Sequence, residues 1–212
     1  MRNPDEISRN EKILLEFLAQ HPDMFVSRKK IKANPQSTLG QSEILQKIRD
    51  AKDKKVIPSQ PSTVPDQAVS VILGAWYGIE EGKWEQVKRE HQYSMVAENL
   101  VGEFLERYIE QVITENNLGW ARAWGDVIRS VDFVKKDGDR WTLLQVKNRD
   151  NSENSSSQSV RAGTEIIKWF RTFSKTGKTN WENFPDERLA TLLDEAAFQS
   201  YIKSYLISEK KQ

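Results

Sequence analysis

The sequence has 212 residues, with no cysteine and only two histidines, His21 and His91. The missing cysteines exclude disulfide bonds and thiolate metal sites, and they fit a reducing compartment. With two histidines, a histidine-rich zinc site is close to excluded. Any bound metal would therefore be held by oxygen ligands, which favours a hard cation.

The sequence also lacks a net charge and a long apolar run. It has 32 basic and 31 acidic residues, for a formal net charge of +1. That balance argues against a protein that coats nucleic acid, although it leaves room for a local basic surface. No apolar run approaches the roughly 18 residues that a membrane span needs. The polar N-terminus has no apolar signal core, so we expect a cytoplasmic protein without membrane attachment.

The N-terminal part of the chain has the apolar spacing of helices. Residues 5–25 predict an amphipathic helix, with Ser8 as its N-cap and Pro22 as its stop signal. A second, polar helix fits residues 41–54.

A stretch with three prolines, residues 56–67, separates these helices from the rest. Its Ser, Gln and Thr background is typical of a linker or an extended arm. We therefore expect a helical N-terminal region over residues 1–60 and a second domain over residues 61–212. In that domain, residues 68–79 predict one helix and residues 80–117 one or two more.

Two strands are predicted by alternation of apolar and polar residues. They cover residues 130–136 and 140–148, and the Asp-Gly-Asp sequence at 137–139 predicts the hairpin turn. On the second strand, Gln145 and Lys147 lie on one face. Together with the helices, the hairpin predicts an α/β fold with a central mixed sheet flanked by helices.

The hairpin brings three polar side chains within reach of one another. The sequence does not fix its register, but a pairing of Asp132 with Gln145 would gather a carboxylate, an amide oxygen and the ammonium of Lys147. Mg²⁺ prefers oxygen ligands and retains several waters. A lysine nearby can orient or deprotonate an attacking water and offset the charge of a phosphate. The alternative is the solvated end of an edge strand.

These residues resemble the signature of the PD-(D/E)xK nucleases. Asp132, followed by a strand ending Gln-Val-Lys at 145–147, matches the variant in which Gln replaces an acidic residue. Upstream, "VGEFLERYIEQVI" is similar to the helix that supplies a Glu to the metal site. The Gly-x-x-x-Glu spacing selects Glu106, with Glu98 and Glu103 as competitors. The sequence departs from the signature in having Ser-Val before Asp132 and Gln in place of a carboxylate.

Downstream, "LLQVKNRDNSENSSSQSVRAGTEIIKWFR" and "TGKTNWENF" are similar to the SinI-type type II restriction endonucleases, and the likeness covers residues 65–185. The resemblance implies Mg²⁺-dependent cleavage of double-stranded DNA at a short palindrome, with Mn²⁺ as a substitute. It suggests a five-base-pair site with GG at one end, CC at the other and a central A·T pair (GGWCC). Asp132, Glu106 and Gln145 would be metal ligands, and Lys147 would orient the water.

The resemblance also implies partners. A palindrome mirrors two-fold protein symmetry, so a homodimer is expected. The host would need a matching DNA methyltransferase.

The polar stretch after the hairpin has the composition of a base-reading loop. Arg can pair with guanine, Asn with adenine, and Ser or Asn with phosphate. The alternative is a flexible linker. The candidate base contacts are Asn148, Arg149, Asn151, Ser152, Asn154, Ser155 and Arg161. We expect an amphipathic helix over residues 160–173, and then a second basic cluster for backbone phosphates at Arg171, Lys175 and Lys178.

Two other functions remain open on sequence alone. One is a nuclease of the same fold that acts in repair or on DNA junctions. The other is a DNA-binding protein without catalysis, for which Gln145 is the argument. Residues 1–60 could be a DNA-embracing arm, a dimer element or simple packing.

Overall fold

The computed structural model describes residues 6–26, 33–151 and 165–211. The chain divides into two compact units. We call Met1–Lys55 with Leu105–Gln212 the sheet unit, and Val56–Phe104 the helical unit. This division differs from the boundary expected at residue 60, because the N-terminal helices and the sheet belong to one unit.

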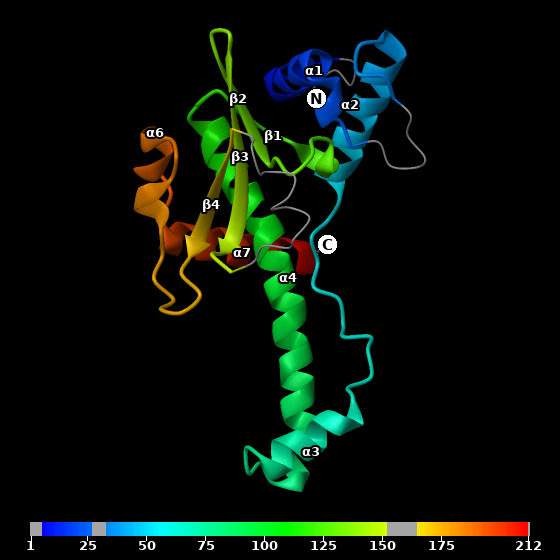
Figure 1. The fold of residues 1–212 in the computed structure, drawn as a ribbon, viewed down its shortest axis with the longest axis vertical. Coiled ribbons are helices and arrows are strands. Elements are labelled where there is room, and N and C mark those ends of the chain that lie inside the picture. The colour runs from blue at the N-terminus through cyan, green and yellow to red at the C-terminus, as the bar shows by residue number, and fades with distance from the viewer. Residues whose placement is uncertain (1–5, 27–32, 152–164, 212) are drawn as a thin grey trace. The chain divides into compact units, whose positions relative to one another are not determined.

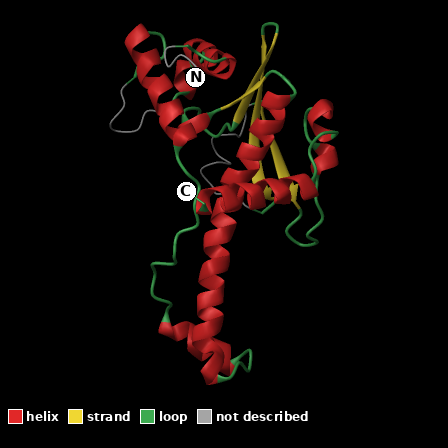
Figure 2. Ribbon diagram, turned by 180° about the vertical axis from the view of Figure 1, so that it is seen from behind, coloured by secondary structure: helices red, strands yellow, loops and turns green. Residues whose placement is uncertain are grey.

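The sheet unit contains a four-stranded sheet in the order β1-β2-β3-β4 (Figures 1 and 2). β1 pairs antiparallel with β2, β2 antiparallel with β3, and β3 parallel with β4. The predicted mixed sheet flanked by helices is thereby confirmed. The strands are β1 (Trp120–Arg122), β2 (Phe133–Asp137), β3 (Arg140–Arg149) and β4 (Ile166–Thr172).

The predicted hairpin is β2 and β3. Phe133 pairs with Leu144, and Asp137 pairs with Arg140 across the turn. Gly138 has a φ of 61°, a backbone conformation that glycine adopts without a steric cost. The turn predicted at residues 137–139 is confirmed.

Two N-terminal helices cover one face of this sheet. They are α1 (Arg9–Gln20) and α2 (Thr38–Asp53), with the short helix η1 (Pro22–Met24) between them. Ser8 caps α1 in a capping box with Glu11, as the sequence predicts for this residue. The strand residues on this face share one core with α1 and α2. They are Ala121, Val134, Leu143 and Ile166, which lie side by side in the strand register.

The other face is packed by the C-terminal half of α4 (Trp84–Glu115) and by α7 (Glu195–Lys210). Trp169 of β4 lies 5.3 Å from Trp181, ring centroid to ring centroid. Trp181 and Tyr108 of α4 both pack against Phe198 of α7. Besides η1, the short helices of this unit are η3 (Trp124–Asp126), η4 (Trp181–Asn183) and α6 (Glu187–Ala190).

The helix expected over residues 160–173 is wrong in its described part, where Ile166–Thr172 forms β4. The apolar residues of this segment fit a helical period over a short window. Its β-branched and aromatic residues fit a strand as well, and pairing along β3 decides between the two.

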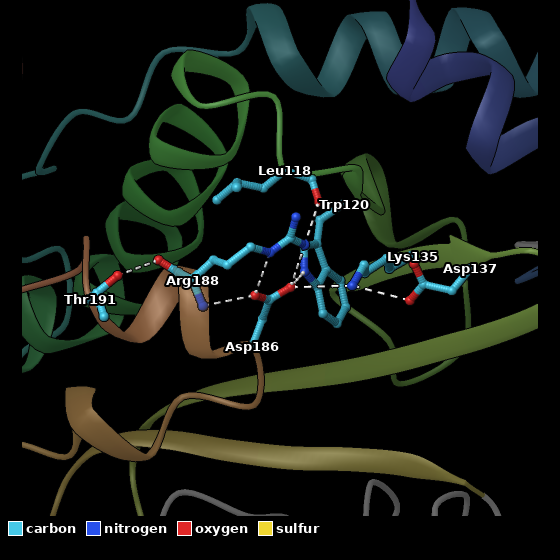
Figure 3. A network of polar contacts seen from close by, with 7 residues as sticks. All are labelled: Leu118, Trp120, Lys135, Asp137, Asp186, Arg188 and Thr191. Carbon is cyan, nitrogen blue, oxygen red and sulfur yellow. Dashed lines mark hydrogen bonds and ion pairs between the residues drawn. The ribbon is translucent and has the colours of Figure 1, made fainter.

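A buried carboxylate joins β1 and β2 to α6 (Figure 3). Asp186 accepts hydrogen bonds from Trp120 Nε1 at 2.9 Å, Arg188 Nη2 at 3.0 Å and Lys135 Nζ at 3.3 Å. Burial alone would raise the pKa of Asp186, but the bonds from Arg188 and Trp120 and the charge of Lys135 hold the pKa well below its usual value. The network therefore ties the edge strand β1 to the C-terminal part of the unit.

The helical unit consists of α3 (Gln67–Ala75), the short helix η2 (Glu81–Lys83) and the first part of α4. α4 is a single helix, where the sequence left one or two open. Residues 58–64 of the proline-rich stretch are not helical or strand-forming, as expected for a linker or arm. Among the described residues, no helix is long and apolar enough to span a membrane.

Candidate active site

Asp132 lies one residue before β2, at the end of the hairpin far from its turn. Its backbone N–H donates to Leu144 O at 2.9 Å, and the strand register continued by one residue sets it opposite Gln145. The Asp132 carboxylate accepts a 2.7 Å hydrogen bond from the backbone N–H of Val146. Val146 stands between Gln145 and Lys147 in the chain. The structure therefore brings these three predicted residues to one strand end.

Gln145 and Lys147 share the face of β3 that carries Leu143, as alternation predicts. Gln145 is 2% exposed, whereas Lys147 is partly exposed. In the parallel pairing with β4, Lys168 is the partner of Gln145, and Phe170 is the partner of Lys147. Asp132, Gln145 and Lys168 therefore lie side by side across neighbouring strands, and Lys168 is the second lysine near Asp132 after Lys147.

The electrostatic surroundings of Asp132 disfavour its charge. Desolvation raises the pKa of Asp132 to about 6, and the nearby carboxylate of Asp126 adds to the increase. The hydrogen bond from Val146 and the charges of Lys147 and Arg122 act in the opposite direction without cancelling it. A cation at this carboxylate would be favoured, since it would compensate a charge that the protein compensates only in part.

Glu106 lies on α4, where its carboxylate is engaged by Arg122 of β1. Arg122 Nη2 and Nε donate to Glu106 Oε2 at 2.8 and 3.2 Å. Arg122 is 3% exposed, and its guanidinium carbon lies 3.7 Å from the ring centroid of Trp124. Arg122 therefore acts on two of the predicted acidic residues, by an ion pair with Glu106 and by its charge on Asp132.

The oxygen atoms at this strand end suit a hard cation that takes only a few of its ligands from the protein. Among the described residues, no group of three or more His, Cys, Asp or Glu side chains could hold a metal. The carboxylate of Asp132 and the amide oxygen of Gln145 are hard ligands on adjacent strands, and a Mg²⁺ ion takes most of its remaining ligands from water and phosphate. These residues fit such an ion.

The candidate DNA contacts are distributed over the end of β3 and the loop after β4. Arg149 and Asn151 are exposed, and Lys175 and Lys178 are exposed in the loop 173–178. The Asp150 carboxylate holds this loop near the end of β3 by accepting the Ser174 N–H at 2.9 Å. Four candidates, Ser152, Asn154, Ser155 and Arg161, lie outside the described residues.

Two candidates for DNA contact make ordered contacts within the protein. Asn148 Oδ1 accepts from Arg171 Nη2 at 2.9 Å and from Nε at 3.1 Å. Arg171 Nη1 also pairs with Glu195 of α7, at 2.6 Å. The charge of Arg171, which we expected at a backbone phosphate, is thus directed at Glu195, and Asn148 is fixed in orientation.

Two residues near the site are absent from the sequence prediction. Arg122 belongs to a three-residue strand that no alternation reveals, and Lys168 lies in the segment taken for a helix. The signal for Lys168 was the β-branched and aromatic content of residues 166–172, which favours a strand parallel to β3.

The model of the SinI restriction endonuclease family matches residues 1–208. The chain belongs to this family. The type II restriction enzyme Eco47I of Escherichia coli is 40% identical over 210 residues, which are 97% of this chain and 89% of that protein. The type II restriction enzyme SinI of Salmonella infantis is 39% identical over 214 residues, covering 96% and 89%. The resemblance found in the sequence is confirmed, and it extends beyond residues 65–185.

Membership in the SinI family makes the protein a site-specific deoxyribonuclease of a restriction system. Its mixed sheet with flanking helices is consistent with the restriction-endonuclease-like fold. Type II restriction endonucleases generally use a divalent metal.

Proposed function

We propose that the protein cleaves double-stranded DNA at a short palindromic site with Mg²⁺, at the strand end formed by Asp132, Gln145 and Lys147. One observation carries the proposal. The Asp132 carboxylate accepts a hydrogen bond from the backbone N–H of Val146, which lies between Gln145 and Lys147. The hairpin geometry therefore brings the three residues of the signature together.

Asp132 and Gln145 would hold Mg²⁺, or Mn²⁺ in its place, through their oxygen atoms. When bound, the ion supplies positive charge to the scissile phosphate and lowers the pKa of water. Glu106 is the third ligand in this proposal. Arg122 holds the Glu106 carboxylate in place by donating to Oε2.

Lys147 orients the attacking water and offsets charge on the phosphate. It is partly exposed on the face that carries Gln145, so its ammonium group is accessible both to a water molecule and to the DNA backbone. Lys168 stands opposite Gln145 in the next strand and adds a second positive charge on that face. Both lysines act on the side of the sheet where Asp132 presents its carboxylate.

Recognition of the DNA base sequence would use residues at the end of β3 and in the β3–β4 connection, namely Asn148, Arg149, Asn151, Ser152, Asn154, Ser155 and Arg161. Lys175 and Lys178 would contact phosphates from the loop beside the end of β3. A GGWCC-like target follows from the resemblance noted in the sequence, and we keep that site as part of the proposal.

A palindromic target calls for two copies related by a two-fold axis, so the working form would be a homodimer. We expect the protein to act in the cytoplasm, where its DNA substrate would be. A cognate methyltransferase would protect the host DNA. The family favours this function over repair or junction cleavage.

The first prediction tests the three-residue site. Asp132→Ala should abolish cleavage, because it removes the carboxylate at the strand end. Lys147→Ala should reduce the rate by orders of magnitude, since each 1.36 kcal/mol of lost transition-state stabilisation is about tenfold. Single-turnover cleavage of a DNA fragment with one site measures both effects.

Asp139→Ala provides the matched control, because Asp139 is an exposed residue of the same hairpin, in its turn. It should cleave at the wild-type rate. All three variants should retain the wild-type far-UV spectrum and DNA binding. Wild-type cleavage by both Asp132→Ala and Lys147→Ala would remove the site from the mechanism.

A further inference from the structure

The helical unit exposes large apolar side chains on and just after α3. We call the side chains of Val69, Val71, Ile72, Trp76 and Tyr77 the apolar face. Trp76 is 82% exposed, Val71 65% and Ile72 57%. Large apolar surfaces of this kind are uncommon in monomeric proteins and mark sites of interaction.

The contact of α3 with α4 is made by its small residues instead. Ser70 accepts a 2.9 Å hydrogen bond from Lys88 Nζ, and both side chains are buried. At Gly74, a Cβ atom would come within 2.8 Å of the Trp84 ring, so only glycine permits this approach. α3 therefore presents its small residues to α4 and its large apolar side chains to the outside, the reverse of a helix buried by its own unit.

The charged residues around the apolar face indicate which kind of partner could bind it. Residues 67–79 contain no charged side chain, whereas the helical unit as a whole, residues 56–104, has seven acidic and three basic residues. An acidic surrounding repels the phosphates of DNA and of anionic lipids. An uncharged face, in contrast, can meet its own copy across a two-fold axis without like charges opposing each other.

The size of the apolar face also suits a second copy. A buried aromatic side chain covers about 150–250 Å². Two aromatic and three aliphatic side chains therefore offer on the order of 500 Å², before any polar rim is added. Each partner in a standard interface contributes about 800 Å². The apolar face would thus form the centre of an interface whose rim comes from its neighbours.

We propose that the apolar face docks onto the apolar face of a second copy of this chain, and that this contact forms the two-fold dimer. The inference rests on the proposed function in one respect, because a palindromic target is what requires two copies. The helical unit then has the role of pairing two sheet units, each of which carries one strand-end site.

The mass of the DNA-free protein tests the proposal. Sedimentation velocity over a range of concentrations should give a dimer for the wild type. Ile72→Glu and Trp76→Glu place charges at the centre of the contact, and each should raise the dimer dissociation constant at least about a hundredfold, or 2.7 kcal/mol. Leu39→Glu is the matched control, since Leu39 is 74% exposed on α2 of the sheet unit. It should remain a dimer.

Crosslinking gives a second readout that does not depend on a destabilising charge. Because the chain has no cysteine, Tyr77→Cys introduces one reactive thiol. A short bis-maleimide should join two Tyr77→Cys chains, and it should leave Leu39→Cys monomeric on a denaturing gel.

Three results would overturn the inference: a monomeric wild type at all concentrations, dimeric Ile72→Glu and Trp76→Glu, or equal crosslinking of both cysteine variants. The measurements use no DNA and no metal, so their failure leaves the nuclease site untouched. Conversely, cleavage by Asp132→Ala would refute the site and leave the dimer contact standing.

Discussion

At the residue scale, the site depends on a carboxylate whose charge the protein compensates only in part. The Asp132 carboxylate has a pKa raised to about 6, although Val146, Lys147 and Arg122 all stabilise its ionised form. An arrangement that disfavours the anion until a cation arrives is typical of a functional site rather than a stabilising ion pair. Gln145 keeps a second negative charge out of this buried position, where two carboxylates would repel each other.

Gln145→Glu tests this view of the site. The new carboxylate would be buried beside Asp132, so the free energy of unfolding without metal should fall by a few kcal/mol. Mg²⁺ or Mn²⁺ should then raise the melting temperature more than it does in the wild type, because the ion is bound by an additional charge. Differential scanning calorimetry with EDTA and with each ion measures this. Gln46→Glu, at an exposed position of α2, should show no added metal effect. An equal metal shift in both variants would contradict the assignment.

Sequence alone selected Asp132, Gln145 and Lys147 as candidates, and alternation predicted that Gln145 and Lys147 share a face. It left the register open, and the two-residue turn after Asp137 decided it. The ion pair of Arg122 with Glu106 was beyond the sequence. This ion pair joins a residue of a helix to a residue of a three-residue strand. Helical periodicity and strand alternation describe single elements, so neither predicts a contact between two of them.

At the scale of elements, the parallel strand β4 was the main error. β4 packs between a buried aromatic layer and the α1–α2 core and shows no strict alternation, so Ile166–Thr172 fits one face of a helix equally well. The hairpin was predictable because its turn carries a local signal. The parallel pairing of β3 with β4 has no such signal, and it results from long-range packing.

The Asp186 network that joins β1, β2 and α6 gives a stability prediction. Asp186→Asn should lower the free energy of unfolding by about 2 kcal/mol at neutral pH, because it removes charge-assisted bonds from Arg188 and Lys135. The folded-state pKa of Asp186 is depressed, so its contribution is complete above the unfolded pKa of about 4.

The stability difference should therefore shrink as the pH falls below about 4 towards the lower folded pKa. Urea unfolding of both proteins between pH 3 and pH 7 would measure it. Asp194→Asn, a change at the N-cap of α7, is a comparison outside the network. A difference between the wild type and Asp186→Asn that stays constant with pH would show that the charge of Asp186 contributes nothing.

At the scale of the whole molecule, the residues of the proposed nuclease site all belong to one unit. The sheet unit contains the strand-end site, and α1 and α2 complete its core. α1 and α2 therefore pack against the sheet, in line with one of the three roles that the sequence left open for the N-terminal region. The division expected at residue 60 followed composition, whereas the units follow packing. The prolines of residues 56–67 indicate where helices and strands are interrupted. They do not indicate which helices pack against the sheet.

Digestion of a mapped plasmid with and without Mg²⁺ is the decisive test of metal-dependent, site-specific cleavage by this protein. We expect discrete fragments whose ends all fall at one short palindromic sequence of the GGWCC kind, and intact plasmid when EDTA removes the ion. Mn²⁺ should restore the same fragments. Fragments that form equally in EDTA would contradict the metal-dependent mechanism. A smear, or cuts only at joints and damaged sites, would contradict site-specific cleavage by this strand end.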